Sequence, residues 1–306
     1  MTFESTTKLA PLNYISPLVQ ERILIGLGSS SSARTIQTLL VPKPKKIRNG
    51  RASQFHLKED GFELLQGISR PDYATLQRPR DRFYATRELV VPLATKLVRD
   101  RFGLTPFYAH FTPPYLRRQT AASSLDTRDH SSGATPHAMV HNDYAWDSYQ
   151  NMKSISDYFG LPRDSPRLGK VVQSFQRAGR VIVLQFWMNA QPEDTVIEND
   201  TLALCHPRSI QTPDLVARRV TGYNNSQYEF TILQAKDSPT HEWFYWPALG
   251  FKECLVWVGY DSAWGDDVKP CFHTSFHDST VPKGRPRESV EARVIVFLDE
   301  KLQSRL

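Results

Sequence analysis

The stretch Val181-Ile182-Val183-Leu184-Gln185-Phe186-Trp187 decides the fold, because β-branched and aromatic residues follow one another there without a helix breaker. Apolar runs of similar length recur toward the C-terminus, with Gly, Pro, Asn and Asp between them. These runs are 201–205, 228–233, 243–246, 254–260 and 292–298. Short strands that do not alternate with helices predict an antiparallel barrel or sandwich after residue 180.

The region before residue 180 is richer in helical patterns. Residues 82–101 repeat leucine every four positions and are followed by Gly103, which predicts a helix that Pro92 either kinks or divides. Further helices are expected at 17–27, 147–159 and 167–178, and strands at 35–41 and 107–111. The expected class is therefore α+β, with a mainly β core and flanking helices.

The domain prediction is one unit over 1–306. Residues 1–33 are polar and Ser-rich, so we expect an irregular N-terminal extension, and 34–135 should pack on the barrel as a flank. A basic cluster between Lys43 and Arg51 is interrupted by Pro42, Pro44 and Gly50, which indicates an exposed loop. The cluster has no interleaved aromatic residues, so we expect no binding of nucleic acid.

Composition excludes several classes. The chain carries a net charge of +6 and has no apolar run of eighteen residues, so no membrane span is expected. Residues 1–12 lack the pattern of a signal peptide, and three cysteines without a CxxC pair suit a reducing compartment. We therefore expect a cytoplasmic protein without a disulfide scaffold or a thiolate zinc site.

The motif most indicative of chemistry is Val140-His141-Asn142-Asp143-Tyr144. On a strand, residues two apart point to the same face, so His141 and Asp143 can present an imidazole and a carboxylate together. With a second histidine they would form a facial triad that binds Fe(II) and leaves coordination positions open. The alternative is a surface histidine followed by a turn aspartate.

The expected third ligand lies in Phe272-His273-Thr274-Ser275-Phe276-His277-Asp278, where His273 and His277 are both candidates. Farther on, Arg287 and Ser289 share one strand face. A guanidinium fork and a hydroxyl suit the far carboxylate of a dicarboxylic co-substrate. Arg287 could instead be an exposed loop residue or pair with Glu291, and Arg293 is the reserve candidate for the same role.

In this combination the chain resembles the fungal hydroxylase/desaturase group of non-haem Fe(II)/2-oxoglutarate-dependent oxygenases, which includes gibberellin desaturase-like and meroterpenoid endoperoxidase-like proteins. The resemblance covers most of the chain past the first thirty residues. It is carried by 59–64, 116–118, 140–143, 201–205, 243–245, 260–262, 273–276 and, most specifically, 286–293.

The resemblance implies a double-stranded β-helix, also called a jelly-roll or cupin-like fold, with flanking helices. It implies His141, Asp143 and His273 as Fe(II) ligands, with His273 favoured over His277, and 2-oxoglutarate held by Arg287 and Ser289. Gln185 is a further candidate to donate to the co-substrate. The chain departs from the family pattern after Trp187, before Tyr260 and at His206.

The expected activity is hydroxylation, desaturation or a related C–H oxidation, with O₂, of a hydrophobic fungal secondary metabolite of terpenoid, meroterpenoid or polyketide type. Loops 119–137 and 206–227 are expected at the pocket mouth, and the sequence leaves a homodimer open. Two alternatives are a cupin-like metal hydrolase or isomerase, and a non-catalytic partner subunit that retains the fold. Candidate aromatic walls of the substrate pocket are Phe111, Tyr144, Trp146, Phe186 and Phe276.

Overall fold

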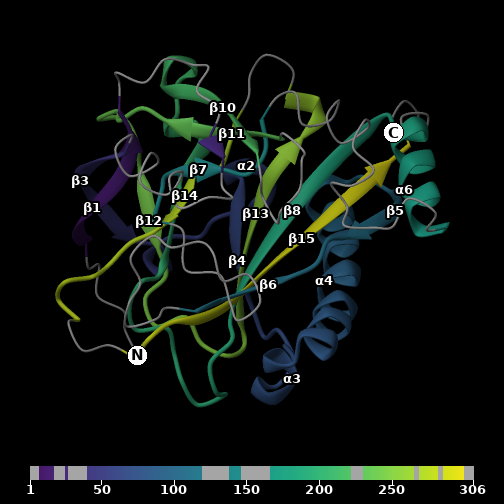
Figure 1. Cartoon of the computed structure of the whole chain (residues 1–306), viewed down its shortest axis with the longest axis horizontal. Coiled ribbons are helices and arrows are strands. Elements are labelled where there is room, and N and C mark those ends of the chain that lie inside the picture. The colour runs from purple at the N-terminus through teal and green to yellow at the C-terminus, as the bar shows by residue number, and fades with distance from the viewer. Residues whose placement is uncertain are drawn as a thin grey trace.

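Two β-sheets stack face to face in the computed structural model, and helices cover the outer side of one of them (Figure 1). The structure describes residues 7–16, 25–26, 40–118, 138–145, 166–221, 230–264, 269–281 and 285–299. Within these residues, no helix is both long enough and apolar enough to cross a membrane.

The larger sheet, sheet A, is built from segments spread over most of the chain and is mainly antiparallel. Its strands, in spatial order, are β1 (Thr7–Ile15), β3 (Leu40–Asn49), β12 (Trp243–Tyr245), β9 (Leu202–Cys205), β14 (His273–Ser275), β7 (His141–Asn142), β11 (Phe230–Ala235), β10 (Leu215–Thr221) and β2 (Ile25–Gly26). Short central strands from distant parts of the sequence thus lie side by side.

The second sheet, sheet B, is antiparallel and contains the longest continuous pairing of the fold, between β8 and β15. Its strands, in spatial order, are β4 (Phe62–Gln66), β13 (Glu253–Asp261), β8 (Arg180–Asn189), β15 (Glu288–Leu298) and β5 (Pro106–Phe111), and β6 (Tyr115–Arg118) also pairs with β15. β13, β8 and β15 run next to one another through the centre of Figure 1.

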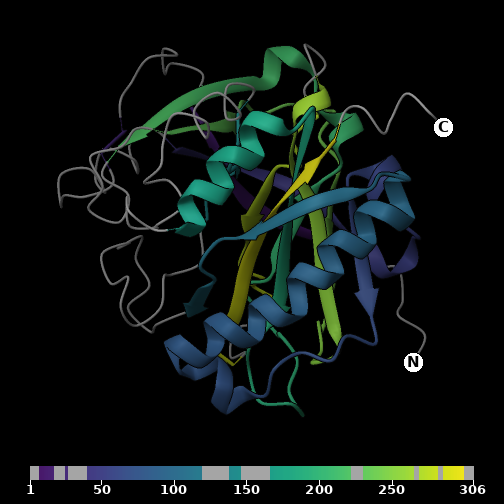
Figure 2. The same cartoon turned by 90° about the vertical axis from the view of Figure 1, so that its right-hand side faces the viewer.

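Alternation along β8 assigns its two faces. Leu184 and Phe186 pack toward the long helix α4, which lies across sheet B in Figure 2, whereas Trp187 packs toward sheet A. Gln185 shares the inward direction with Trp187, because side chains two apart on a strand point the same way. The helices are α2 (Leu57–Asp60), α3 (Tyr73–Gln77), α4 (Pro79–Phe102) and α6 (Pro166–Arg177).

The expected strands and helices that fall on described residues are largely present. α4 confirms the helix predicted at 82–101 and runs through Pro92 as one element, and α6 confirms the helix at 167–178. The predicted β-rich C-terminal part is confirmed, with β15 beginning four residues earlier than expected. The helix expected at 17–27 is wrong at Ile25–Gly26, which form strand β2, and its other residues lie outside the described residues. Residues 35–39 of the strand expected at 35–41, the loop expected at 119–137 and the helix expected at 147–159 also lie outside them.

The expectation of an irregular extension at 1–33 is wrong for residues 7–15. These residues form β1, a strand of sheet A, in which alternate side chains from Ala10 to Tyr14 are buried in a core cluster. The apolar residues alternate with polar ones and proline, so the segment reads as polar overall although one face is apolar.

The expectation of an exposed loop at the basic cluster is also wrong, because Leu40–Asn49 is strand β3. β1 pairs with Leu40–Arg48, but β12 pairs only with Ile47–Asn49. Among the described residues, β3 therefore has a neighbour on one side only at Pro42 and Pro44, and a strand edge tolerates a missing N–H. The loop expected at 206–227 is likewise wrong in part, because this range contains the strand β10.

Leu184 offers a test of the packing between sheet B and α4. Its side chain is fully buried in the cluster that includes Val90 and Ala94 of the helix. Leu184→Ala should lower the free energy of unfolding by about 2–5 kcal/mol, as buried leucine truncations do. Leu9→Ala is the matched control, since Leu9 is 69% exposed, and should change it little. Equal effects in chemical denaturation would contradict the assigned packing.

Candidate metal and co-substrate site

Three side chains that are far apart in sequence meet between the two sheets: His141, Asp143 and His273. One ligand atom from each lies within 4.8 Å of the others. Nε2 of His141 is 3.6 Å from Oδ1 of Asp143, and Nε2 of His273 is 4.0 Å from Oδ2. The structure thus brings together the three residues that the sequence proposes as ligands.

Pairing in sheet A places the two imidazoles. His141 on β7 is the direct cross-strand neighbour of His273 on β14, and the ring centroids are 4.4 Å apart. Nδ1–H of His141 donates to the carbonyl of Met139 at 2.8 Å, and Nδ1–H of His273 donates to that of Cys271 at 3.2 Å. Each of these bonds leaves Nε2 for a metal, which is how ligating histidines are commonly oriented.

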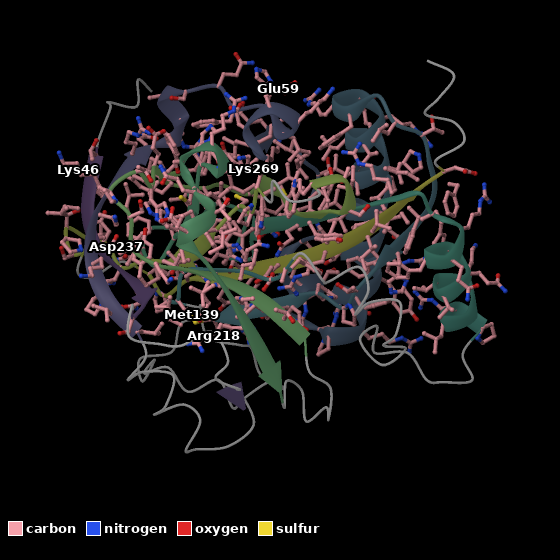
Figure 3. The ribbon with its side chains drawn as sticks, turned by 90° about the horizontal axis from the view of Figure 1, so that it is seen from above. Lys46, Glu59, Met139, Arg218, Asp237 and Lys269 are labelled. Carbon is pink, nitrogen blue, oxygen red and sulfur yellow. The ribbon has the colours of Figure 1, made fainter. Side chains whose placement is uncertain are left out.

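The chain behind His141 is also held. Gln234, its cross-strand neighbour on β11, donates to the Met139 sulfur at 2.5 Å and accepts from Nε of Arg218 at 3.1 Å. Figure 3 labels Met139 and Arg218, which lie together on the side where β10 extends. The carbonyl that orients His141 therefore belongs to a residue that is itself fixed by side-chain contacts.

The charge states of Asp143 and His273 suit metal binding. Burial alone would raise the pKa of Asp143, but Arg293 and the two histidines outweigh it and hold this pKa well below the usual range. Burial, with His141 close by, lowers the pKa of His273 to about 4. At neutral pH the site therefore offers a carboxylate and a neutral imidazole, the forms that bind a cation.

A pocket adjoins the two histidines and reaches Arg287, just before β15. Trp187 and Trp257 line it, together with Arg117, Glu291, Thr274 and Ser275. Arg287 is 2% exposed, and its guanidinium stacks near the Trp187 ring at 5.5 Å. Burial, followed by the positive charge of Arg117, lowers the pKa of Arg287 to about 9.

Arg287 is a buried cation whose hydrogen bonds, among the described residues, go to neutral oxygens. Nη1 donates to the carbonyl of Asp200 and, at 3.4 Å, to the hydroxyl of Ser275. Its Nε and the hydroxyl of the buried Ser289 have no hydrogen-bond partner among the described residues. Leaving such groups without partners is costly, so they mark where a polar ligand would bind.

The neighbouring arginines differ from Arg287 because they are paired with acids. Arg117 donates to Glu291 at 2.6 Å, and Arg293 donates to both Glu291 and Asp143. Burial by itself would raise the pKa of Glu291, but the two arginines lower it to about 2. The salt bridge of Glu291 therefore goes to Arg117 and Arg293 instead of Arg287.

Other residues singled out in the sequence lie elsewhere. His277 follows β14, is exposed and lies 3.4 Å from a carboxylate oxygen of Asp200. The aromatic-wall expectation is wrong for Phe111 and Phe186, which pack in the core beneath α4 because their strand positions face the helix. Tyr144 and Phe276 belong to other core clusters, and Trp146 lies outside the described residues.

Sequence reasoning missed Arg117, Trp257 and Gly259, and it treated Glu291 only as an alternative partner. β6 pairing with β15 places Arg117 opposite Ser289, and β13 places Trp257 opposite Gln185. Glu291 lies two residues from other candidates on the same strand, and this spacing was the signal available for it in the sequence. Residues that meet through pairing between distant strands show no comparable spacing in the sequence.

Comparisons with known proteins agree with this picture. The hydroxylase/desaturase efuI of Hormonema carpetanum is 24% identical over 296 residues, covering 90% of this chain and 88% of that protein. The solved iron and alpha-ketoglutarate-dependent endoperoxidase NvfI and a variant of it are each 19% identical. Their TM-scores are 0.70 and 0.71, over 96% and 98% of this chain and 99% and 100% of theirs.

These likenesses confirm two predictions. The expected resemblance to the fungal hydroxylase/desaturase and endoperoxidase group is borne out by the relatives that match, and the expected jelly-roll fold is confirmed by the solved structures. A family model described as "Oxidoreductase/YMDC permease-like domain" matches residues 12–297. The match spans nearly the whole chain, and the chain therefore belongs to this oxidoreductase family.

Proposed function

We propose that the protein is a non-haem Fe(II)/2-oxoglutarate-dependent oxygenase that oxidises a C–H bond of a hydrophobic small molecule. The observation that carries the proposal is the pairing of two features in one cavity. Both histidines of the His-Asp-His cluster line it, and so does a buried arginine whose Nε has no partner among the described residues. The relatives named as iron- and ketoglutarate-dependent support the same assignment.

The donor set fits iron. Two imidazoles and one carboxylate form the facial arrangement typical of non-haem Fe(II) oxygenases, which keep open positions on the metal. Iron bound by His141, Asp143 and His273 would supply the oxidising chemistry, with O₂ as oxidant and 2-oxoglutarate as the reductant that leaves as succinate and CO₂. The chain's own contribution is to fix the three ligands and to shield the site.

The far end of the pocket fits the distal carboxylate of a keto diacid. Arg287 offers an unpaired Nε–H, and Ser289 offers a buried hydroxyl without a partner among the described residues. A guanidinium binds a carboxylate through charge-assisted hydrogen bonds, and the hydroxyl adds a donor. Arg293, the reserve candidate, is already paired with two acids. We therefore assign the carboxylate to Arg287 and Ser289.

Two buried tryptophans form part of the pocket wall. Trp187 and Trp257 are both buried, and the Trp257 ring lies 5.0 Å from that of His273. Such a buried setting strengthens the electrostatic attraction of Arg287 for an anion, since the effective dielectric constant is lower than in water.

The substrate class follows from the relatives, which are a hydroxylase/desaturase and an endoperoxidase. We propose a fungal secondary metabolite of terpenoid, meroterpenoid or polyketide type, oxidised by hydroxylation, desaturation or a related reaction. A cytoplasmic location belongs to the same proposal. The absence of nucleic-acid binding stays a prediction from the sequence, which leaves a homodimer open.

The two alternatives make different predictions. A metal hydrolase or isomerase on the same barrel has no need for an arginine that binds a distal carboxylate, and a non-catalytic subunit needs neither group. The Arg287 contacts favour the oxygenase over both, because a buried cation is retained at a cost unless a ligand compensates it.

Succinate release tests the proposal directly. Purified protein with Fe(II), 2-oxoglutarate and O₂ should release succinate, and a substrate from a fungal terpenoid or polyketide extract should increase the rate. Omission of iron should stop it. Succinate formation at the level of a protein-free blank, with and without extract, would contradict the proposal.

A further inference from the structure

The carboxylate of Asp143 is held from sheet B by two donors that bind the same oxygen. Gln185 on β8 donates from Nε2 to Oδ2 at 2.5 Å. Arg293 on β15 donates to Oδ2 from Nη2 at 2.8 Å and from Nε at 3.1 Å. Gln185 and Arg293 are direct cross-strand neighbours. Among the described residues, neither donor reaches Oδ1, which faces His141.

Arg293 is itself fixed by a chain of alternating charge. Its Nη2 donates to Glu291, two residues earlier on the same face of β15, and Glu291 accepts from Arg117 at 2.6 Å. Arg117, Glu291 and Arg293 are all buried or nearly so. The guanidinium therefore has little rotational freedom, and the direction from which it approaches Asp143 is set by the sheet.

Gly259 makes the second donor possible. It lies at a register shift in β13, and a Cβ built there would be 2.2 Å from Oε1 and 2.9 Å from Cδ of Gln185. Its carbonyl accepts from Nδ2 of Asn142 at 3.0 Å. Asn142 is the middle residue of the His-Asn-Asp motif, so one irregularity of β13 supports both the ligand turn and the amide that holds Asp143.

We propose that Arg293 and Gln185 are positioning residues that keep Asp143 as a one-oxygen ligand, with Oδ2 occupied and Oδ1 presented to the metal. The inference rests on the proposed function and goes beyond it. A metal that takes two histidines and one carboxylate oxygen keeps three positions of an octahedron, enough for a bidentate keto acid and O₂. A carboxylate that turned to bind through both oxygens would occupy one of them.

Arg293 has two opposing effects on metal affinity, so its removal shows which of them is larger. Its positive charge repels a divalent cation, so its removal would tighten metal binding if charge alone mattered. Its fork orients the ligand, so its removal weakens binding if orientation matters. Partners that hold metal ligands in place typically contribute about 10–100-fold in metal affinity, so we expect the loss of orientation to dominate.

The experiment is an anaerobic titration with Co(II), followed by its visible absorption, without keto acid. Arg293→Met and Gln185→Ala should each weaken Co(II) binding about tenfold or more relative to the wild type. Arg285→Met is the matched control, because Arg285 is exposed two residues before Arg287, and should leave the affinity unchanged. Unchanged or tighter Co(II) binding in both site variants would overturn the inference.

Gly259 supplies a second test. The effect of its substitution on Co(II) binding should depend on Gln185, and a general loss of stability would not produce that dependence. Gly259→Ala should weaken Co(II) binding about tenfold in the wild type, because the new methyl group displaces the Gln185 amide. The same change in a Gln185→Ala background should cost almost nothing, since the amide is already gone. Equal losses in both backgrounds would show that Gly259 acts independently of Gln185.

The melting temperature of each variant separates loss of the fold from loss of the ligand. If Arg293→Met does not fold, because it leaves Asp143 without its cation, the Gln185 and Gly259 series still decides the question. A wild-type protein that binds no Co(II) would count against the proposed function. Normal Co(II) binding in the wild type with unaffected variants would remove only the positioning role.

Discussion

Substitution of His273 by glutamine should lower Fe(II)-dependent turnover of 2-oxoglutarate by about 1,000-fold or more, equivalent to about 4 kcal/mol in the barrier. The side chain supplies one of three ligand atoms that lie within 4.8 Å of one another, and glutamine does not offer an imidazole nitrogen there. Metal binding, measured anaerobically, should fall with it. The readout is succinate released per protein at saturating iron.

His277→Gln is the matched control for this variant. His277 is only four residues farther along the chain, but it is exposed and contacts Asp200 instead of the cluster. Its replacement should leave turnover within about twofold of wild type, as surface substitutions away from a site usually do. A large loss with His277→Gln and none with His273→Gln would exchange the two histidines and contradict the assigned ligand set.

Arg287→Leu should raise the dissociation constant for 2-oxoglutarate about 100-fold, or about 2.7 kcal/mol. The variant removes a charge-assisted contact in a buried site, where the loss of one partner costs about 2–5 kcal/mol. The metal ligands are untouched, so Fe(II) binding should persist. Calorimetric titration of the anaerobic Fe(II)-loaded protein with 2-oxoglutarate measures the change.

Arg285→Leu controls for the loss of a positive charge nearby, because Arg285 lies on the surface. It should change the 2-oxoglutarate affinity by less than about twofold. Arg287→Lys should recover part of the affinity, since lysine keeps the charge without the planar fork. If Arg287→Leu bound 2-oxoglutarate as tightly as wild type, the distal carboxylate would have to be held elsewhere, and the assignment of Arg287 would be wrong.

The sequence was most informative where a local pattern carries the structure. β8 was predicted because β-branched and aromatic residues follow one another in its run, and α4 was predicted because leucine recurs every four residues. β1 and most of β3 were missed for the opposite reason. Their exposed faces and prolines give the composition of a loop, and only the partner strand shows that one face is buried.

Some residues of the candidate site were likewise predictable from a local pattern, and others were not. His141 and Asp143 were recognisable from their spacing, and His273 was favoured over His277 through the family resemblance. That His273 lies opposite His141 is a property of sheet pairing between distant segments, which spacing does not encode. The role of Glu291 between Arg117 and Arg293 depends on the pairing of β6 with β15, so residue type alone could not predict it.

Gln185 shows what the alternation of side chains along a strand can and cannot predict. Alternation along β8 correctly placed it on the inward face, and the structure shows its amide donating to Asp143. A contact to the co-substrate stays a prediction. Alternation could not predict the space beside Gln185. This space exists because residue 259, at the register shift of β13, is glycine.

The central claim is that one cavity binds iron at His141, Asp143 and His273 and a keto diacid through both the iron and Arg287. Anaerobic equilibrium titration with Fe(II) and then 2-oxoglutarate tests it most directly. The account predicts one iron per chain and 2-oxoglutarate binding that requires the iron. Binding of 2-oxoglutarate with equal affinity to metal-free protein, or one tightly bound iron retained in His273→Gln, would contradict it.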